Sequence, residues 1–136
     1  LTQNAFNDWI KENKTCDEKK YKEIYKLRCK RIPDEVFIEK KSDGYNIKIL
    51  EIKNQNSPGS VDLKLYAGYC LIREYKKCLE ILGIKVIKIE YGFTLCNFFK
   101  KIKYKTILEN VKEDDIQIFW GSDKNYFEKL DEWIYN

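Results

Sequence analysis

The chain has 136 residues, of which 43% are hydrophobic, and a net charge of +4; these values indicate one folded domain that permits, without requiring, an anionic partner. Histidine is absent, which excludes Ser-His-Asp and Cys-His catalysis and leaves carboxylates, lysine, tyrosine or a metal for any chemistry. No hydrophobic run approaches the length of a membrane span and no signal-peptide pattern is present, so we expect an intracellular protein, in the cytoplasm or nucleus, with no membrane partner.

The first third of the chain predicts helical structure followed by an ambiguous segment. Apolar residues at helical spacing predict a helix from about Gln3 to Glu12. Thr15 and Glu18 have the spacing of a capping box, which predicts a short helix to about Ile24. The stretch "YKLRCKRI" (25–32) alternates as a half-buried strand does, but a continuous helix over 16–30 is an equally good interpretation.

A β-hairpin and a long helix follow. "VFI" (36–38) predicts a strand, "KSDGYN" a turn in which Asp-Gly tolerates positive φ, and residues 45–54 a second strand. Pro58 and Gly59 end that strand. An amphipathic helix is predicted over 61–82, with Gly83 as its terminator and an apolar side that comprises Leu63, Ala67, Cys70, Leu71 and Cys78.

The last third adds a strand at 84–91, a helical region over about 95–111, a short strand at 116–120 and a closing helix that Ser122 caps. The order of elements predicts one α/β domain over 1–136, with a mixed sheet of an antiparallel meander plus a crossover strand, flanked by helices.

The five cysteines are widely spaced and odd in number, and no CxxC pair occurs. This pattern excludes a zinc ribbon and favours reduced core cysteines in an intracellular protein over a set of disulfides.

The strand at 45–54 carries an acid and a base on one face. Glu51 and Lys53 stand side by side because alternate strand residues share a face. Pairing across the predicted hairpin brings Asp34 next to them. Two adjacent carboxylates repel unless a cation bridges them, and Mg²⁺ prefers such oxygen ligands while keeping several waters. The set suits phosphodiester hydrolysis, with Lys53 serving the attacking water or the charge on the phosphate. The alternative is a strand-face ion pair beside a turn aspartate.

Pro33-Asp34 followed by Glu51-Ile52-Lys53 resembles the motif of the PD-(D/E)XK nuclease superfamily, which includes many restriction endonucleases and Holliday-junction resolvases. The resemblance covers residues 1–91 as a restriction-endonuclease-like core and leaves 92–136 as C-terminal additions. It also favours the interpretation of 25–32 as a strand. It implies a DNA endonuclease that uses Mg²⁺, with Mn²⁺ as a substitute.

The resemblance also implies roles for the site residues. Asp34, Glu51 and the Ile52 carbonyl would bind the metal, and Lys53 would serve the attacking water. Members often add a glutamate from the first helix; the candidates are Glu12, Glu18 and Glu23, and Glu23 is favoured because Glu18 is explained as a cap.

The same resemblance suggests how DNA is bound. Gln55 is common in restriction-type members, although a supporting loop role is the simpler interpretation. Ser60 is first an N-cap of the long helix and second a phosphate contact. Lys64 lies one turn from the metal edge and is the lysine expected near double-stranded DNA.

We expect a homodimer of restriction type, in which each subunit cuts one strand. A resolvase or repair nuclease, and a nuclease-fold subunit that only binds, are the alternatives. The run "NFFKKIKYK" (97–105) fits either a nucleic-acid surface or, preferably, a helix with an aromatic core side.

Overall fold

The computed structural model describes residues 3–15, 17–19, 33–53, 65 and 67–136. Their elements are, in chain order, α1 (Gln3–Asn13), β1 (Glu35–Lys41), β2 (Gly44–Lys53), α4 (Gly68–Ile81), β3 (Val86–Leu95), the 3-10 helices η1 (Asn97–Lys100) and η2 (Ile102–Tyr104), α5 (Lys105–Glu113), β4 (Gln117–Trp120) and α6 (Tyr126–Tyr135). Most of the predicted short helix that ends at about Ile24 (residues 16 and 20–24), the segment 25–32 and the break at Pro58-Gly59 lie outside the described residues.

The described strands form one mixed sheet in the order β1-β2-β3-β4. β1 and β2 are an antiparallel hairpin, while β2, β3 and β4 run parallel to one another. Helix α4 connects β2 to β3 and helix α5 precedes β4, as a parallel sheet requires. The α/β class, the mixed sheet and the flanking helices predicted from the sequence are therefore confirmed.

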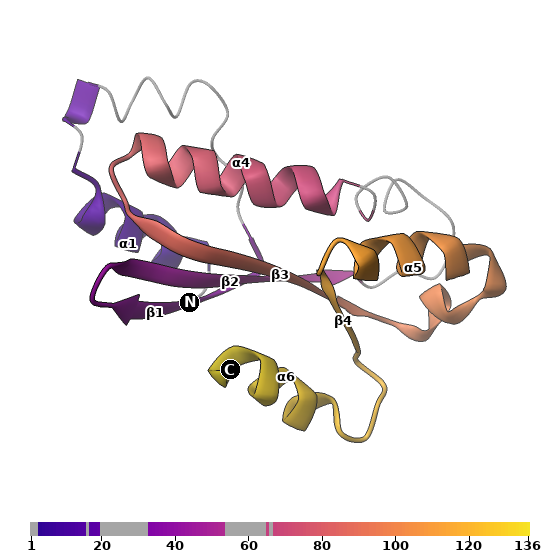
Figure 1. The fold of residues 1–136 in the computed structure, drawn as a ribbon. Helices are drawn as coiled ribbons and strands as arrows, with labels where there is room; N and C mark the ends of the chain where they lie inside the picture. The colour runs from indigo at the N-terminus through magenta and orange to yellow at the C-terminus, as the bar shows by residue number, and fades with distance from the viewer. Residues whose placement is uncertain (1–2, 16, 20–32, 54–64, 66) are drawn as a thin grey trace.

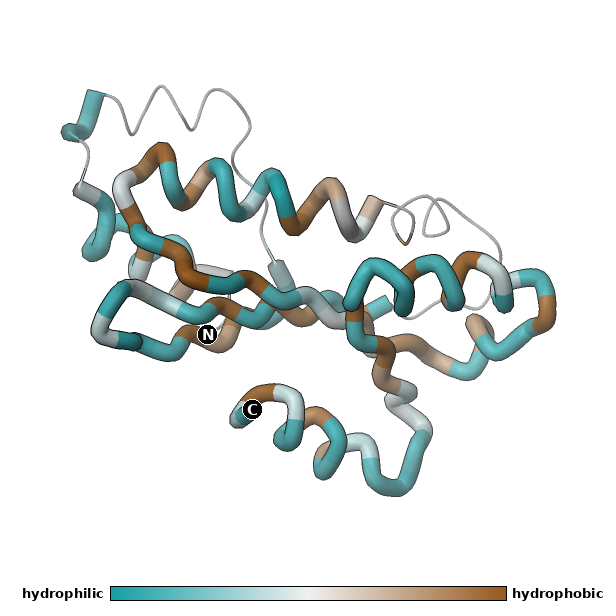
Figure 2. The backbone as a smooth tube through the Cα atoms, viewed as in Figure 1, coloured by the Kyte–Doolittle hydropathy of each residue, from teal (hydrophilic) through white to brown (hydrophobic). Residues whose placement is uncertain are grey.

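Helices cover both faces of the sheet. Figure 1 shows α4 above the sheet and α6 below it. The main core lies on the α4 side, where Ile47, Ile49, Tyr91 and Phe93 pack against apolar residues of α1, α4 and α5. Figure 2 shows hydrophobic positions along the central strands and alternating hydrophobic and hydrophilic positions along the helices.

Helix α6 covers the opposite face through a small number of contacts. The Trp133 ring packs on Phe119 with 5.4 Å between centroids, and Gly92 leaves room for it, because a Cβ there would lie 3.2 Å from Trp133. The Tyr126 hydroxyl lies 2.9 Å from that of Thr94 on β3. These contacts hold α6 against the parallel strands.

A buried lysine joins α6 to the sheet. Lys48, at the centre of β2, is 9% exposed and donates hydrogen bonds to the carbonyl oxygens of Trp133 and Ile134 at the end of α6. Its ammonium also lies 3.5 Å from the Glu90 carboxylate on β3. A cation at a helix C-terminus is favourable because the last carbonyls lack helical partners. Nothing in the sequence pattern around Lys48 predicts this role.

Several predicted boundaries and contacts are wrong. β3 continues to Leu95, because both β2 and β4 supply hydrogen-bonding partners there. The predicted helix over 95–111 is two 3-10 turns followed by α5. Cys70, predicted on the apolar side of α4, is exposed. Ser122 donates to the Asn97 side chain at 2.7 Å and does not cap α6, whose N-cap residue is Asn125.

The cysteine prediction also needs correction. Cys78 is disulfide-bonded, whereas Cys70 and Cys96 form no disulfide. The expectation of reduced cysteines is wrong for Cys78. Reduced thiols were one reason to expect an intracellular location, and the disulfide removes that support. Among the residues that the structure describes, no helix has the length and apolar character needed to cross a bilayer.

Candidate active site

The β1–β2 hairpin brings Asp34 and Glu51 together. The turn at Ser42-Asp43, followed by Gly44 with φ of 148°, sets a register in which Glu35 lies opposite Leu50. One residue further along, Asp34 therefore faces Glu51. The Asp34 carboxylate accepts a hydrogen bond of 2.7 Å from the backbone N–H of Ile52. The predicted meeting of Asp34 with the end of β2 is thus present in the structure.

Glu51 is a buried carboxyl group at the end of a core strand. It is 8% exposed and shares its face of β2 with the core residues Ile47 and Ile49. The pKa of Glu51 is raised from 4.5 to about 7, chiefly by burial, with further contributions from the charge of Asp34 and from a hydrogen bond between the two carboxyl groups. Two carboxylates held together where little water reaches them repel one another, so they favour a shared proton or a bound cation.

Lys53 stands beside Glu51 on the same face. Its ammonium lies 3.5 Å from a Glu51 oxygen and acts in the opposite direction, lowering the pKa of Glu51. The side chain of Lys53 is 18% exposed, so the pair is only partly accessible to water. The sequence interpretation that these residues are neighbours on one strand face is confirmed, while their catalytic role stays a prediction.

Ile52 points away from this face and is 47% exposed. In a β-strand the N–H and C=O of one residue are directed to the same neighbouring side. Because the Ile52 N–H reaches Asp34, its carbonyl oxygen is directed toward the Asp34 side as well. Two carboxylates and one carbonyl oxygen are thus available at one edge of the sheet.

These oxygen atoms fit a magnesium ion by their chemistry. Mg²⁺ takes hard oxygen ligands and keeps several waters, so two carboxylates and a carbonyl suffice on the protein side. Within the described ranges, no group of three or more His, Cys, Asp or Glu side chains is arranged to hold a metal. The remaining predicted site residues, Glu23, Gln55, Ser60 and Lys64, lie outside the described residues.

Asp34 also has a purely structural explanation. Its side chain occupies the position on the Ile52 N–H that a further β1 carbonyl would take, so it completes the hydrogen bonding at the hairpin end. That role alone does not require a second carboxyl group. Glu51, whose burial costs free energy in the charged form, is the feature that a structural role leaves unexplained.

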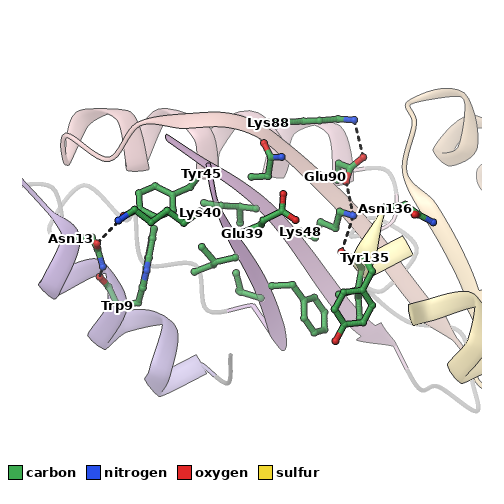
Figure 3. A pocket seen from close by; sticks show the side chains of 16 residues that line it. Trp9, Asn13, Glu39, Lys40, Tyr45, Lys48, Lys88, Glu90, Tyr135 and Asn136 are labelled. Atoms are coloured by element: carbon green, nitrogen blue, oxygen red, sulfur yellow. Dashed lines mark hydrogen bonds and ion pairs between the residues drawn. The ribbon is translucent and has the colours of Figure 1, made fainter. Parts of the chain in front are cut away.

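A wide cavity lies elsewhere on the sheet. It has a volume of about 860 Å³, and its lining includes Tyr45, Lys48, Glu90 and Tyr135 but not Asp34, Glu51 or Lys53. Figure 3 shows the Lys48 ammonium between Glu90 and the end of α6. Lys48 thus anchors α6 to the sheet, and this cavity is separate from the carboxylate site.

A hollow of about 410 Å³ lies beside η1, η2 and α5, lined by Ile102, Trp120 and several lysines. The lysines are Lys100, Lys101, Lys105 and Lys112. The sequence signal for this surface was the alternation of aromatic residues and lysines over 97–105. Its aromatic side does face the core, as the preferred interpretation held: Phe99 and Tyr104 are fully buried.

Comparisons with protein-family models, with curated proteins and with solved structures find no match to this chain. The resemblance to the PD-(D/E)XK superfamily therefore rests on the motif residues and on their arrangement in the fold.

Proposed function

We propose that the protein is a Mg²⁺-dependent DNA endonuclease with a restriction-endonuclease-like core. The observation that carries the proposal is the buried Glu51 carboxyl group, held against Asp34 at one end of the sheet with the Lys53 ammonium 3.5 Å away. The order of hairpin, crossover helix α4 and parallel strand β3 supports it, because this order around the motif residues resembles the core of the family.

Each residue has a definite task in this proposal. The carboxylates of Asp34 and Glu51, with the Ile52 carbonyl, hold the cation. When bound, Mg²⁺ supplies positive charge beside the scissile phosphate and lowers the cost of generating a hydroxide nucleophile. Lys53 donates hydrogen bonds to the attacking water or to a phosphate oxygen, where negative charge grows in the transition state. Water forms a new P–O bond, one ester P–O bond breaks, and the departing oxygen takes up a proton.

The partial exclusion of water from the site suits this chemistry. Charges interact more strongly where water is excluded, so the ammonium of Lys53 stabilises the phosphate more than an exposed lysine does. Glu51 must be ionised to hold the cation, and the cation itself favours that ionised form. The raised pKa of Glu51 means that ionising this group costs free energy in the metal-free protein, and metal binding offsets that cost.

The test is nicking of a supercoiled plasmid with Mg²⁺, with Mn²⁺ and with excess chelator, by the parent protein and by Asp34→Asn. The matched control is Asp43→Asn, which changes an aspartate in the turn at the far end of the same hairpin. We expect metal-dependent nicking by the parent and the control and none by Asp34→Asn. Undiminished nicking in chelator would refute the proposal.

The class of nuclease needs a further measurement. Discrete bands from long duplex DNA support a restriction-type enzyme, and selective cutting of branched DNA supports a resolvase. DNA binding without cleavage in any metal supports the non-catalytic alternative. A homodimer, which a palindromic site requires, is tested by the molar mass in solution with and without duplex.

A further inference from the structure

The strongest unassigned feature of the molecule is a cluster of four lysines on η1, η2 and the start of α5. We call it the lysine ridge; it comprises Lys100, Lys101, Lys103 and Lys105. These four charges equal the net charge of the whole chain, +4, so the other residues hold 22 basic and 22 acidic side chains. The excess positive charge of the protein is therefore concentrated in six residues.

The ridge is ordered by aromatic rings beneath it. The Lys101 ammonium lies 4.2 Å from the centroid of the Phe98 ring, and that of Lys103 lies 4.9 Å from the Tyr104 ring. The Lys100 ammonium lies 5.1 Å from the Trp120 ring. Such contacts hold long side chains in place while leaving their charge available. Figure 2 shows hydrophobic and hydrophilic residues interleaved through this segment.

Most of these charges are not neutralised within the protein. Lys100 lies 3.8 Å from the Asp123 carboxylate. Among the described residues no carboxylate forms an ion pair with Lys101, Lys103 or Lys105. On α5, Glu109 lies one turn from Lys105 without forming an ion pair with it, and the acidic cluster Glu113, Asp114 and Asp115 stands at the other end of the helix, about 12 Å away at 1.5 Å per residue.

The ridge lies at the same edge of the sheet as the carboxylate site. Lys53 pairs laterally with Leu95 and Leu95 with Trp120, all on one face at the carboxyl ends of parallel strands. Two strand spacings separate Lys53 from Trp120, about 10 Å. Lys100 lies over Trp120. This separation is close to the width of the major groove of B-form DNA, about 12 Å.

We propose that the lysine ridge binds the phosphate backbone of double-stranded DNA across one groove from the phosphate that occupies the Asp34–Glu51 site. This inference rests on the proposed function for its choice of partner and of duplex geometry. It makes the ridge the main source of affinity and leaves the chemistry to the carboxylate site.

The observations favour a nucleic acid over an anionic membrane surface. Membrane binding through such a segment needs several exposed apolar side chains. Here Phe99 and Tyr104 are buried, and Ile102, which is 88% exposed, stands between Lys101 and Lys103 as the large apolar side chain at the tip. A single such side chain gives weak membrane anchoring, whereas unpaired lysines on a fixed scaffold suit phosphate binding.

The experiment measures duplex affinity by fluorescence anisotropy in chelator, where cleavage is absent, at salt concentrations from 50 to 300 mM. The variant carries Lys101→Gln, Lys103→Gln and Lys105→Gln. The control carries Lys40→Gln, Lys85→Gln and Lys88→Gln, which removes the same charge at the opposite end of the sheet. Thermal unfolding of all proteins, and the three single ridge substitutions, exclude a folding defect as the cause.

We expect the ridge variant to bind at least tenfold more weakly at about 100 mM salt, and the slope of log K against log salt to fall by about 3, one for each phosphate contact. The control should keep a slope within about 1 of the parent. Equal slopes for the ridge variant and the control would overturn the inference.

Two further outcomes separate this inference from the proposed function. A parent that binds duplex through the ridge but does not cleave with Mg²⁺ supports the ridge and refutes the nuclease. A parent that cleaves while the ridge variant keeps its salt slope supports the nuclease and refutes the ridge. Binding to anionic lipid vesicles that is lost in Ile102→Ser, without comparable binding to duplex, would show that the partner is a membrane.

Discussion

The free energy cost of the Glu51 carboxylate gives the sharpest test of the site. Its folded-state pKa is about 7 against 4.5 for an ordinary glutamate, so the folded protein holds this proton more tightly than the unfolded chain does. At 1.36 kcal/mol for each pKa unit, ionising Glu51 costs the folded state about 3 kcal/mol. The tighter binding of this proton stabilises the folded protein. This stabilisation is fully present below pH 4.5 and is lost as the pH rises from 4.5 to 7.

Replacement of Glu51 by glutamine keeps the shape of the side chain and removes the charge. In metal-free buffer we expect Glu51→Gln to match the parent near pH 4 and to exceed it by about 3 kcal/mol at pH 8, or roughly 10 °C in Tm. The assay is urea unfolding of both proteins in chelator at pH 4, 6 and 8. Other carboxyl groups titrate in both proteins, so the difference between them isolates Glu51.

Glu39 on the same hairpin provides the control. It is exposed, and Lys41, through a hydrogen bond and its charge, lowers the pKa of Glu39, so Glu39→Gln should show no gain at high pH. A difference between parent and Glu51→Gln that does not change from pH 4 to pH 8 would refute the argument from burial. If Asp34 and Glu51 also bind Mg²⁺, adding the ion at pH 8 should stabilise the parent alone and narrow the gap; at a concentration 100 times Kd the gain is about 2.7 kcal/mol.

The remaining predictions concern activity and packing. Lys53→Ala should bind DNA normally but cut it roughly 100-fold more slowly or worse in single-turnover assays with Mg²⁺; near-parent rates would show that Glu51 and Lys53 form only a strand-face pair. Ca²⁺ should support DNA binding with little cleavage, as nicking assays in each ion would measure. Lys48→Met should lower the free energy of unfolding by about 3 kcal/mol, because it removes the donor to the α6 carbonyls and leaves Glu90 with Lys88 as its remaining ion-pair partner, and the double change with Glu90→Gln should recover part of the loss in urea unfolding. Gly83→Ala should destabilise by more than about 1 kcal/mol in thermal unfolding, since φ is 80° and the new Cβ would lie against Thr15.

Local patterns in the sequence were enough to predict much of the central fold. The Asp-Gly turn fixes the hairpin register, and the register alone places Asp34 beside Glu51. Gly83 ends α4 because only glycine adopts its positive φ without strain. These features depend on residues near one another along the chain, and for that reason the candidate site could be predicted before the structure was known.

Other features depended on partners distant in sequence. Gly92, Phe93 and Thr94 have no strong strand pattern of their own; they extend β3 because β2 and β4 flank them. Lys48 looks like a misplaced charge in an apolar strand until α6, more than 80 residues later, supplies the carbonyls that bind it. In the sequence, the lysines of 100–105 fit either a nucleic-acid surface or the outer side of a helix with an aromatic core side. The parallel sheet decides that they lie at the same edge as Asp34 and Glu51, because the carboxyl ends of β2, β3 and β4 meet there.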